Sequence, residues 1–283
     1  MEIKKIGVLG AGAMGSGIAQ VASQTGYEVI LRDIEDSFVE RGLKSINSFL
    51  SKSVEKGKMD AAQKDAIMGR IKGTTDMSAM KDADFVIEVV LENLDLKKKV
   101  FKELDEICAP DVILASNTSS MSITEIAAST KRPDKVCGMH FFNPVPLMKL
   151  VEVIRGYSSS DETISTVSAL AEKLGKVVVE VKKDSPGFIV NRIMLPHFLE
   201  AIKMVEEGVA SIEDIDKAVK NGLNYPMGPF ELMDLTGIDI AYAITEYFHN
   251  ELNKELKWVA PNLFKSMIRA NKLGKKTGGG WYK

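Results

Sequence analysis

The stretch GVLGAGAMG, residues 7–15, decides the fold of the first half of this chain. A β-rich run that starts at Lys4 leads into it, and the helical pattern MGSGIAQVASQTG starts within it. Glycines mark turns of many kinds, so a lone G-x-G-x-x-G is weak support for a ligand. Between a strand and a helix, however, backbone N–H groups and the helix dipole can face a pyrophosphate. The stretch therefore favours a dinucleotide-binding turn over a turn without a ligand.

Each glycine of this turn has a separate task. Gly10 allows the tight turn, Gly12 lets phosphate approach the backbone, and Gly15 permits close contact between helix and strand. Asp33 ends the next β-rich run, YEVILRD, where a carboxylate can accept both ribose hydroxyls of adenosine and would repel a 2′-phosphate. The pattern favours NAD, while the neighbouring Arg32 leaves NADP open and FAD remains a competitor from this segment alone.

Short β-rich runs alternate with helical patterns well past the middle of the chain, which is typical of a parallel sheet covered by helices on both faces. The runs are KKIGVLG, YEVILRD, DADFVIEVV, DVILAS, KVCGMHFF, KLVEVI and KVVVEVK, with a helix over residues 161–174 before the last. From SPGFIVNRI onward only helical periodicity remains. We predict an α/β fold: an N-terminal Rossmann-type, doubly wound, mostly parallel sheet over residues 1–185 and an all-helical C-terminal domain over residues 186–283, opened by a helix starting at Pro186.

Composition excludes several classes of partner. With 45% hydrophobic and 27% charged residues and a formal net charge of -2, the chain has no bulk bias toward nucleic acid or anionic membrane. No run approaches the length of a membrane span. Cys108 and Cys137 show neither metal nor redox spacing, which favours a reducing, cytoplasmic location. His140, His197 and His249 are widely spaced, so we expect no metal site.

His140 and Glu152 stand out in GMHFFNPVPLMKLVEVI, residues 138–154, because both lie in apolar β-rich runs. A carboxylate flanked by Val151 and Val153 in a parallel sheet is costly unless it is paired. A histidine is the obvious partner, and a glutamate that orients an imidazole makes a general acid/base pair. A structural histidine, or a Glu152 that points to solvent at a sheet edge, remains open at this point.

Small polar residues, NTSS at 117–120, follow the β-rich run DVILAS at the end of the sheet where doubly wound folds place ligands. Capping of the helix that starts near Ile123 is the alternative. Ser122 can provide that cap, so the sequence does not require Ser119 for it.

Five runs together resemble the short-chain L-3-hydroxyacyl-CoA dehydrogenases, especially the bacterial 3-hydroxybutyryl-CoA members: SNTSSMSI, GMHFFNPVPLMKLVEV, DSPGFIVNRI, NYPMGPFELMDLTG and GKKTGGGWYK. The resemblance covers the whole chain. It implies an NAD-dependent enzyme that interconverts (S)-3-hydroxyacyl-CoA, expected to be 3-hydroxybutyryl-CoA, and the 3-oxoacyl-CoA, here acetoacetyl-CoA. It also implies a homodimer formed through the helical domain.

The resemblance also implies individual roles. His140 would act as the base, with Glu152 as its partner, while Ser119 and Asn191 would hold the reacting oxygen, the histidine or the substrate. Because Asn191 follows Pro186, we expect the second domain to contribute to a cleft between domains. The implied cofactor contacts are Gly10, Gly12, Met14, Gly15, Asp33, Glu92, Lys97, Asn143 and Lys276.

The stretch ERGLKSINSFLSKSVEKGK, residues 40–58, has a helical pattern with a polar row in steps of four from Lys44. A solvated helix face is the ordinary explanation of such a row. An acyl-CoA substrate makes it a docking strip for the nucleotide phosphates, with Ser48, Lys52 and Lys56 as candidates.

Two other functions stay open. A free hydroxy acid or sugar acid could replace the CoA ester on the same two-domain fold. Alternatively, the chain could bind NAD without turnover as a structural or sensing protein. The set Ser119, His140, Glu152 and Asn191 argues against that second alternative, because a structural role would not require all four.

Overall fold

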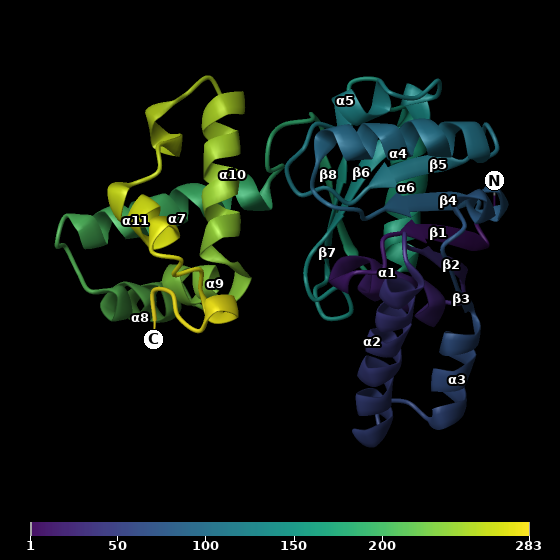
Figure 1. Ribbon diagram of the computed structural model, residues 1–283, viewed down its shortest axis with the longest axis horizontal. Helices are drawn as coiled ribbons and strands as arrows, with labels where there is room; N and C mark the ends of the chain where they lie inside the picture. The colour runs from purple at the N-terminus through teal and green to yellow at the C-terminus, as the bar shows by residue number, and fades with distance from the viewer. Residues whose placement is uncertain (1, 283) are drawn as a thin grey trace. The chain divides into compact units, whose positions relative to one another are not determined.

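The computed structural model describes residues 2–282 and contains two compact units, Met1–Ser185 and Pro186–Lys283 (Figure 1). The first unit is built on an eight-stranded sheet with the order β3-β2-β1-β4-β5-β6-β7-β8. Its strands are β1 (Lys5–Leu9), β2 (Glu28–Arg32), β3 (Ile71–Thr74), β4 (Phe85–Glu88), β5 (Ile113–Ser116), β6 (Val136–Phe141), β7 (Leu150–Ile154) and β8 (Val177–Val181). All neighbours are parallel except β6 and β7, so the predicted mostly parallel sheet is confirmed.

Every predicted β-rich run forms a strand, and β3 is the strand that the sequence did not reveal. It is a four-residue edge strand in which only Ile71 is buried, so no apolar run marks it. The lysine and glycine at its centre, residues 72 and 73, resemble the charged amphipathic stretch on either side, so nothing in the sequence indicates a strand there.

Helices cover both faces of this sheet (Figure 1). They are α1 (Ala13–Gln24), α2 (Asp36–Glu55), α3 (Ala61–Gly69), α4 (Leu94–Ile107), α5 (Ile123–Ala127) and α6 (Asp161–Lys173), with 3₁₀ turns η1 (Met77–Asp82) and η2 (Pro133–Lys135). Helices α1 and α6 bury their apolar residues in one cluster with the sheet. Because β1 leads to β2 on one side and β4 to β5 on the other, right-handed connections put α4 on the opposite face from α1. The carboxyl ends of β1 and β4 are therefore the switch point at which doubly wound sheets bind ligands.

The second unit is helical, as predicted. It consists of α7 (Val190–Glu206), α8 (Ile212–Gly222), α9 (Pro229–Thr236), α10 (Ile238–Glu251), α11 (Asn262–Arg269), η3 (Leu256–Trp258) and η4 (Lys275–Thr277). Up to residue 282, its β-type pairing is limited to one isolated bridge, Gly274 to Gly279. A core of its own holds the unit together, centred on aromatic side chains such as Phe230, Phe248 and Trp258.

The predicted start of the first helix of this unit was wrong. Helix α7 begins at Val190 rather than at Pro186. Gly187 has φ +73° and Phe188 has φ +54°, and two residues in the left-handed region cannot lie inside a right-handed helix. The segment 186–189 is therefore a turn that precedes the helix.

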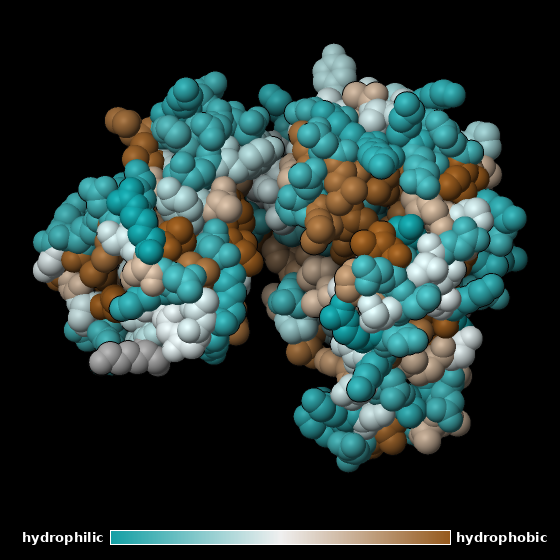
Figure 2. Space-filling view, in the orientation of Figure 1, coloured by the Kyte–Doolittle hydropathy of each residue, from teal (hydrophilic) through white to brown (hydrophobic). Residues whose placement is uncertain are grey.

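The face of each unit seen in Figure 2 is mainly hydrophilic, and a continuous apolar area lies on the visible face of the α/β unit. Over residues 2–282, no helix combines the length and apolarity needed to cross a membrane.

Candidate active site

The glycine turn between β1 and α1 is shaped by close contacts. A Cβ on Gly15 would lie 1.8 Å from the carbonyl oxygen of Gly10, and one on Gly10 would lie 2.5 Å from the oxygen of Val89. A Cβ on Gly12, in contrast, would meet nothing within 4 Å. Among the described residues, no side chain caps the start of α1, whose first backbone N–H groups have no acceptor within the helix. This arrangement fits the pyrophosphate of a dinucleotide.

Asp33 follows β2 and braces the same turn. Its Oδ2 accepts a hydrogen bond from the backbone N–H of Ala11 at 2.7 Å, and its Oδ1 accepts one from Ile34 at 2.7 Å. This bracing role was not predicted. Each carboxylate oxygen can accept more than one hydrogen bond, so the expected contact with ribose hydroxyls remains compatible with it. The neighbouring Arg32 donates from Nε to the carbonyl oxygen of Thr75 at 3.3 Å.

His140 and Glu152 lie directly opposite each other in the antiparallel pair β6–β7. His140 Nδ1 is 2.8 Å from Glu152 Oε2, and the residues are 6% and 0% exposed. The burial rules out a Glu152 that points to solvent. Within the mostly parallel sheet, the strand of Glu152 pairs antiparallel with β6 and parallel with β8. The antiparallel pairing is what brings the carboxylate to the histidine, near the carboxyl end of β6.

The polar cluster after β5 is tied to both neighbouring strands. Asn117 Oδ1 accepts a hydrogen bond from the N–H of Phe141, next to His140, at 2.8 Å. Ser119 donates its N–H to Glu92 Oε1 at 2.9 Å. The expected cap is present, because Ser122 Oγ accepts from the N–H of the third residue of α5. Ser119 is thus held close to the carboxyl ends of β4 and β5.

Glu92 and Lys97, two of the expected cofactor contacts, belong to a network that includes a residue the sequence reading missed. Lys97 is 1% exposed, and its Nζ lies 2.7 Å from Glu88 Oε1 and 3.3 Å from Glu92 Oε2. A direct contact between Lys97 and a cofactor stays a prediction. The signal for Glu88 was present in the run DADFVIEVV, where it interrupts an apolar strand as Glu152 does.

The loop between β6 and β7 is fastened by Lys176, which was also missed. This lysine is buried, and its Nζ donates to the carbonyl oxygens of Val145 and Met148 at 2.6 and 2.9 Å. Burial lowers the pKa of Lys176. Asn143 lies exposed in the same loop, and its expected cofactor contact stays a prediction.

The polar row in steps of four is exposed along α2. Ser48 and Lys52 lie on the helix, whereas Lys56 directly follows it, because α2 ends at Glu55 and not at residue 58 as expected. The cause is Gly57, which adopts φ +66° and closes the helix end.

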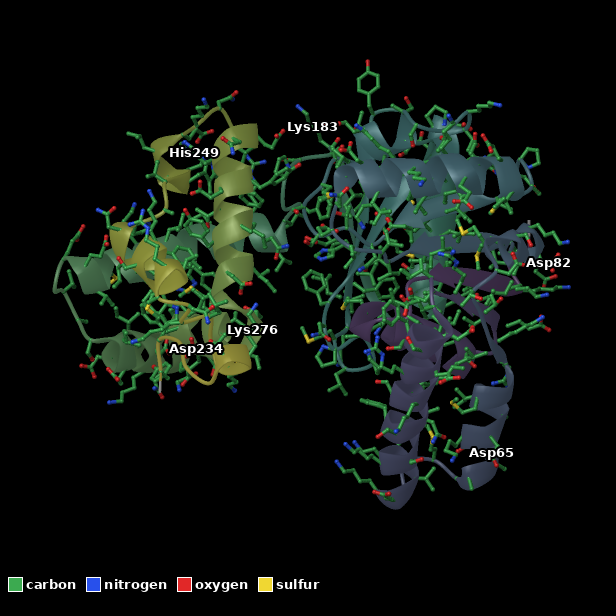
Figure 3. All side chains as sticks on the ribbon, in the orientation of Figure 1. Asp65, Asp82, Lys183, Asp234, His249 and Lys276 are labelled. Atoms are coloured by element: carbon green, nitrogen blue, oxygen red, sulfur yellow. The ribbon has the colours of Figure 1, made fainter. Side chains whose placement is uncertain are left out.

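The remaining expected residues lie in the helical unit. Asn191 is the second residue of α7 and is 9% exposed. Lys276, which is labelled in Figure 3, pairs with Asp239 at 2.5 Å. Their roles toward cofactor and substrate stay predictions. In the part of the chain that is described, no group of three histidine, cysteine, aspartate or glutamate side chains could hold a metal ion.

The open glycine turn at the switch point of a doubly wound sheet is typical of proteins that bind a dinucleotide. A buried histidine–glutamate pair lies in the same unit, and the combination is typical of dinucleotide-dependent oxidoreductases. Residues 5–185 match the NAD binding domain of 3-hydroxyacyl-CoA dehydrogenase, and residues 187–283 match its C-terminal domain. The chain belongs to the 3-hydroxyacyl-CoA dehydrogenase family, and its cofactor is NAD, so the expected family and cofactor are confirmed.

Individual relatives agree over nearly the full length. The chain is 49% identical to a 3-hydroxybutyryl-CoA dehydrogenase of Clostridioides difficile, covering 98% of both chains. It is 43% identical to the human mitochondrial hydroxyacyl-coenzyme A dehydrogenase, covering 99% of this chain and 91% of that one. The crystal structure of (S)-3-hydroxybutyryl-CoA dehydrogenase from Ralstonia eutropha superposes with a TM-score of 0.96 at 46% identity, covering 99% of both chains.

Proposed function

We propose that this protein interconverts (S)-3-hydroxybutyryl-CoA and acetoacetyl-CoA with NAD. The observation that carries the proposal is the buried contact of 2.8 Å between His140 Nδ1 and Glu152 Oε2 in a chain of this family. The substrate follows relatives of 46–49% identity that are named for it. Free hydroxy acids are the alternative substrates.

In the oxidative direction, His140 Nε2 takes the proton of the 3-hydroxyl group. Glu152 holds the Nδ1–H side of the ring and stabilises the imidazolium that forms. NAD supplies the acceptor for the hydride that leaves C3. Ser119 and Asn191 donate hydrogen bonds to the reacting oxygen. In the reductive direction, the imidazolium returns the proton to that oxygen.

Binding is divided among several elements. The turn of residues 10–15, with Met14, takes the pyrophosphate, and Asp33 takes the adenosine ribose. Glu92, Lys97, Asn143 and Lys276 complete the proposed cofactor site. Ser48, Lys52 and Lys56 offer exposed hydroxyl and ammonium groups to the phosphates of CoA.

The proposed assembly is a homodimer formed by the helical unit, in the cytoplasm. Exposed apolar side chains such as Val209, Leu223, Leu235 and Ile240 give this unit a surface that a second copy could cover. Light scattering after size-exclusion chromatography tests it: the mass of two chains supports a dimer, and the mass of one chain contradicts it.

The decisive experiment follows the absorbance of NADH, and of NADPH in parallel, after acetoacetyl-CoA is added to the protein. We expect NADH to be oxidised, and His140→Ala to slow turnover by about 10²–10⁴-fold, the usual contribution of a general acid or base. His249→Ala, in the last turn of α10, serves as the histidine control and should keep full activity. Turnover of free acetoacetate alone would instead favour the free-acid function. Binding of NADH without any turnover would favour the non-catalytic one.

A further inference from the structure

We propose that Glu88, the last residue of β4, is a positioning residue that sets the orientation of Ser119 through Lys97 and Glu92. The proposal rests on the proposed function and extends it to a side chain that cannot touch the substrate, because Glu88 is 0% exposed. The network consists of four residues. Glu88 lies on β4, Glu92 in the segment after β4, Lys97 on α4 and Ser119 in the segment after β5. All lie within the α/β unit.

Both carboxylate oxygens of Glu88 accept hydrogen bonds. Its Oε1 accepts hydrogen bonds from Lys97 Nζ and from the N–H of Val90, both at 2.7 Å. Its Oε2 accepts one from Ser116 Oγ at 2.6 Å. Hydrogen bonds to an ionised group are about twice as strong as neutral ones. Glu88 therefore fixes the ammonium of Lys97 at the carboxyl ends of β4 and β5.

Lys97, held in place by Glu88, in turn holds the carboxylate of Glu92. Its Nζ also lies 3.3 Å from Glu92 Oε2, so one ammonium joins two carboxylates. Glu92 turns its other oxygen away from the lysine: Oε1 accepts from Thr118 Oγ1 at 2.5 Å, from Ser119 N at 2.9 Å and from Ser119 Oγ at 3.3 Å. Ser119, whose hydroxyl is proposed to bind the reacting oxygen, is thus held mainly through its backbone N–H by a carboxylate that the buried pair locates. The longer contact of its hydroxyl can give way to that oxygen.

A buried pair with a merely structural role behaves differently. Replacing both charges by neutral side chains of similar size is often neutral for stability, whereas removing one leaves an unpaired buried charge. In this network, however, neutral replacements leave Glu92 without its cation. Without the ammonium, the carboxylate of Glu92 is held only by Thr118 and by Ser119 itself, so the fold survives while Ser119 loses its fixed position.

The test uses the double variant Glu88→Gln plus Lys97→Met, which removes both charges together. We expect it to fold and to lower kcat with acetoacetyl-CoA by about tenfold or more, since misplacing a reacting group by an ångström can cost about 10²-fold. Repeated in a Ser119→Ala background, the same two changes should lower kcat by a clearly smaller factor, because the hydroxyl they orient is gone. Any loss through the proposed cofactor contact of Lys97 should instead appear as a higher Kd of NADH in both backgrounds. An equal loss in both backgrounds, or no loss in the first, overturns the proposal.

Asp105→Asn is the matched control, because it weakens another buried ion pair of the unit, between Asp105 and Arg132 at 2.7 Å. It should leave kcat unchanged, and an equal loss there overturns the proposal as well. A wild-type protein inactive on acetoacetyl-CoA contradicts the proposed function. A crystal structure of the double variant separates the two ideas: loss of the contact between Glu92 and Ser119 supports positioning by Glu88, and its retention overturns it whatever the substrate is.

Discussion

Glu152 lies between Val151 and Val153 with no exposed surface, and a carboxylate in such a place is costly without a partner. The ring of His140 supplies one, and the same contact selects which ring nitrogen faces the carboxylate. His140 thus both compensates the buried charge of Glu152 and forms the proposed acid/base pair with it. A substitution that keeps the shape of Glu152 but removes its charge separates the two.

Glu152→Gln is therefore expected to keep the fold and to lose most of the activity. The neutral amide no longer stabilises the imidazolium and no longer fixes the tautomer, and changes of this kind cost about 10⁴-fold in a serine protease triad. We expect kcat with acetoacetyl-CoA to fall by about 10²-fold or more. Binding of NADH, followed by fluorescence, should be unchanged. A kcat within about twofold of wild type would mean that the pair is structural.

Among the helices, α1 and α2 offer nucleotides different kinds of contact. Helix α1 offers backbone N–H groups at a start that no side chain from residues 2–282 caps, so its contribution depends on how closely a phosphate can approach. Helix α2 offers exposed side chains in a row, so its contribution is electrostatic and screened by salt. The two helices therefore require different tests.

For α1, Gly12→Ala and Gly15→Ala form a matched pair. A Cβ on Gly12 meets nothing within 4 Å, so this variant should be as stable as wild type and yet bind NADH about tenfold more weakly or worse, because the methyl group occupies the proposed phosphate position. A Cβ on Gly15 would lie 1.8 Å from the oxygen of Gly10, so this variant should also lower the melting temperature. Unchanged NADH affinity in Gly12→Ala would place the pyrophosphate elsewhere.

For the α2 row, Lys52→Ala plus Lys56→Ala should raise KM for acetoacetyl-CoA by about three- to tenfold and leave the Kd of NADH unchanged. Exposed charges contribute little each, so the effect should shrink at high salt. Lys99→Ala plus Lys102→Ala, two exposed lysines of α4, remove the same charge elsewhere and should leave KM unchanged. Equal changes in KM and in the Kd of NADH would show that the row does not recognise CoA.

At the scale of the whole molecule, each unit has its own core and its own spectroscopic reporters. Both tryptophans, Trp258 and Trp281, lie in the helical unit, and both cysteines lie in the α/β unit. Burial raises the pKa of Cys108 to about 11 and that of Cys137 to about 12, so neither thiol should react with a thiol reagent at pH 8 until its unit unfolds. Fluorescence and thiol reactivity thus follow the two units separately.

Asp234→Ala tests this division. Asp234 (labelled in Figure 3) is buried, and its two oxygens accept from the N–H groups of Trp281 and Tyr282 at 2.9 Å each. Leaving these donors without an acceptor should cost the helical unit about 2 kcal/mol. In urea, the fluorescence transition should move to a lower concentration, while the thiol transition should stay in place. Equal shifts of both would show that the units unfold together.

The sequence by itself determined the kind of elements and their order. The glycine turn, the acidic residue after the second strand and the alternation of runs are local patterns, and local sterics and burial fix what such patterns form. The same holds for the motifs that identified the family and for NAD as its cofactor. Where the local pattern was weak or misleading, as at the short strand β3 and at Pro186, the sequence reading failed.

The sequence suggested His140 as the partner of Glu152, but only the tertiary structure decided between that pairing and a Glu152 that points to solvent. His140 and Glu152 are twelve residues apart, and it is the antiparallel register of β6 and β7 that sets them opposite each other. Glu88 and Lys97 meet although they belong to different elements, β4 and α4, and no sequence periodicity predicts that contact. The physical reason is that an element depends on neighbours along the chain, whereas a site depends on pairing and packing between elements, which is specified by the whole core at once.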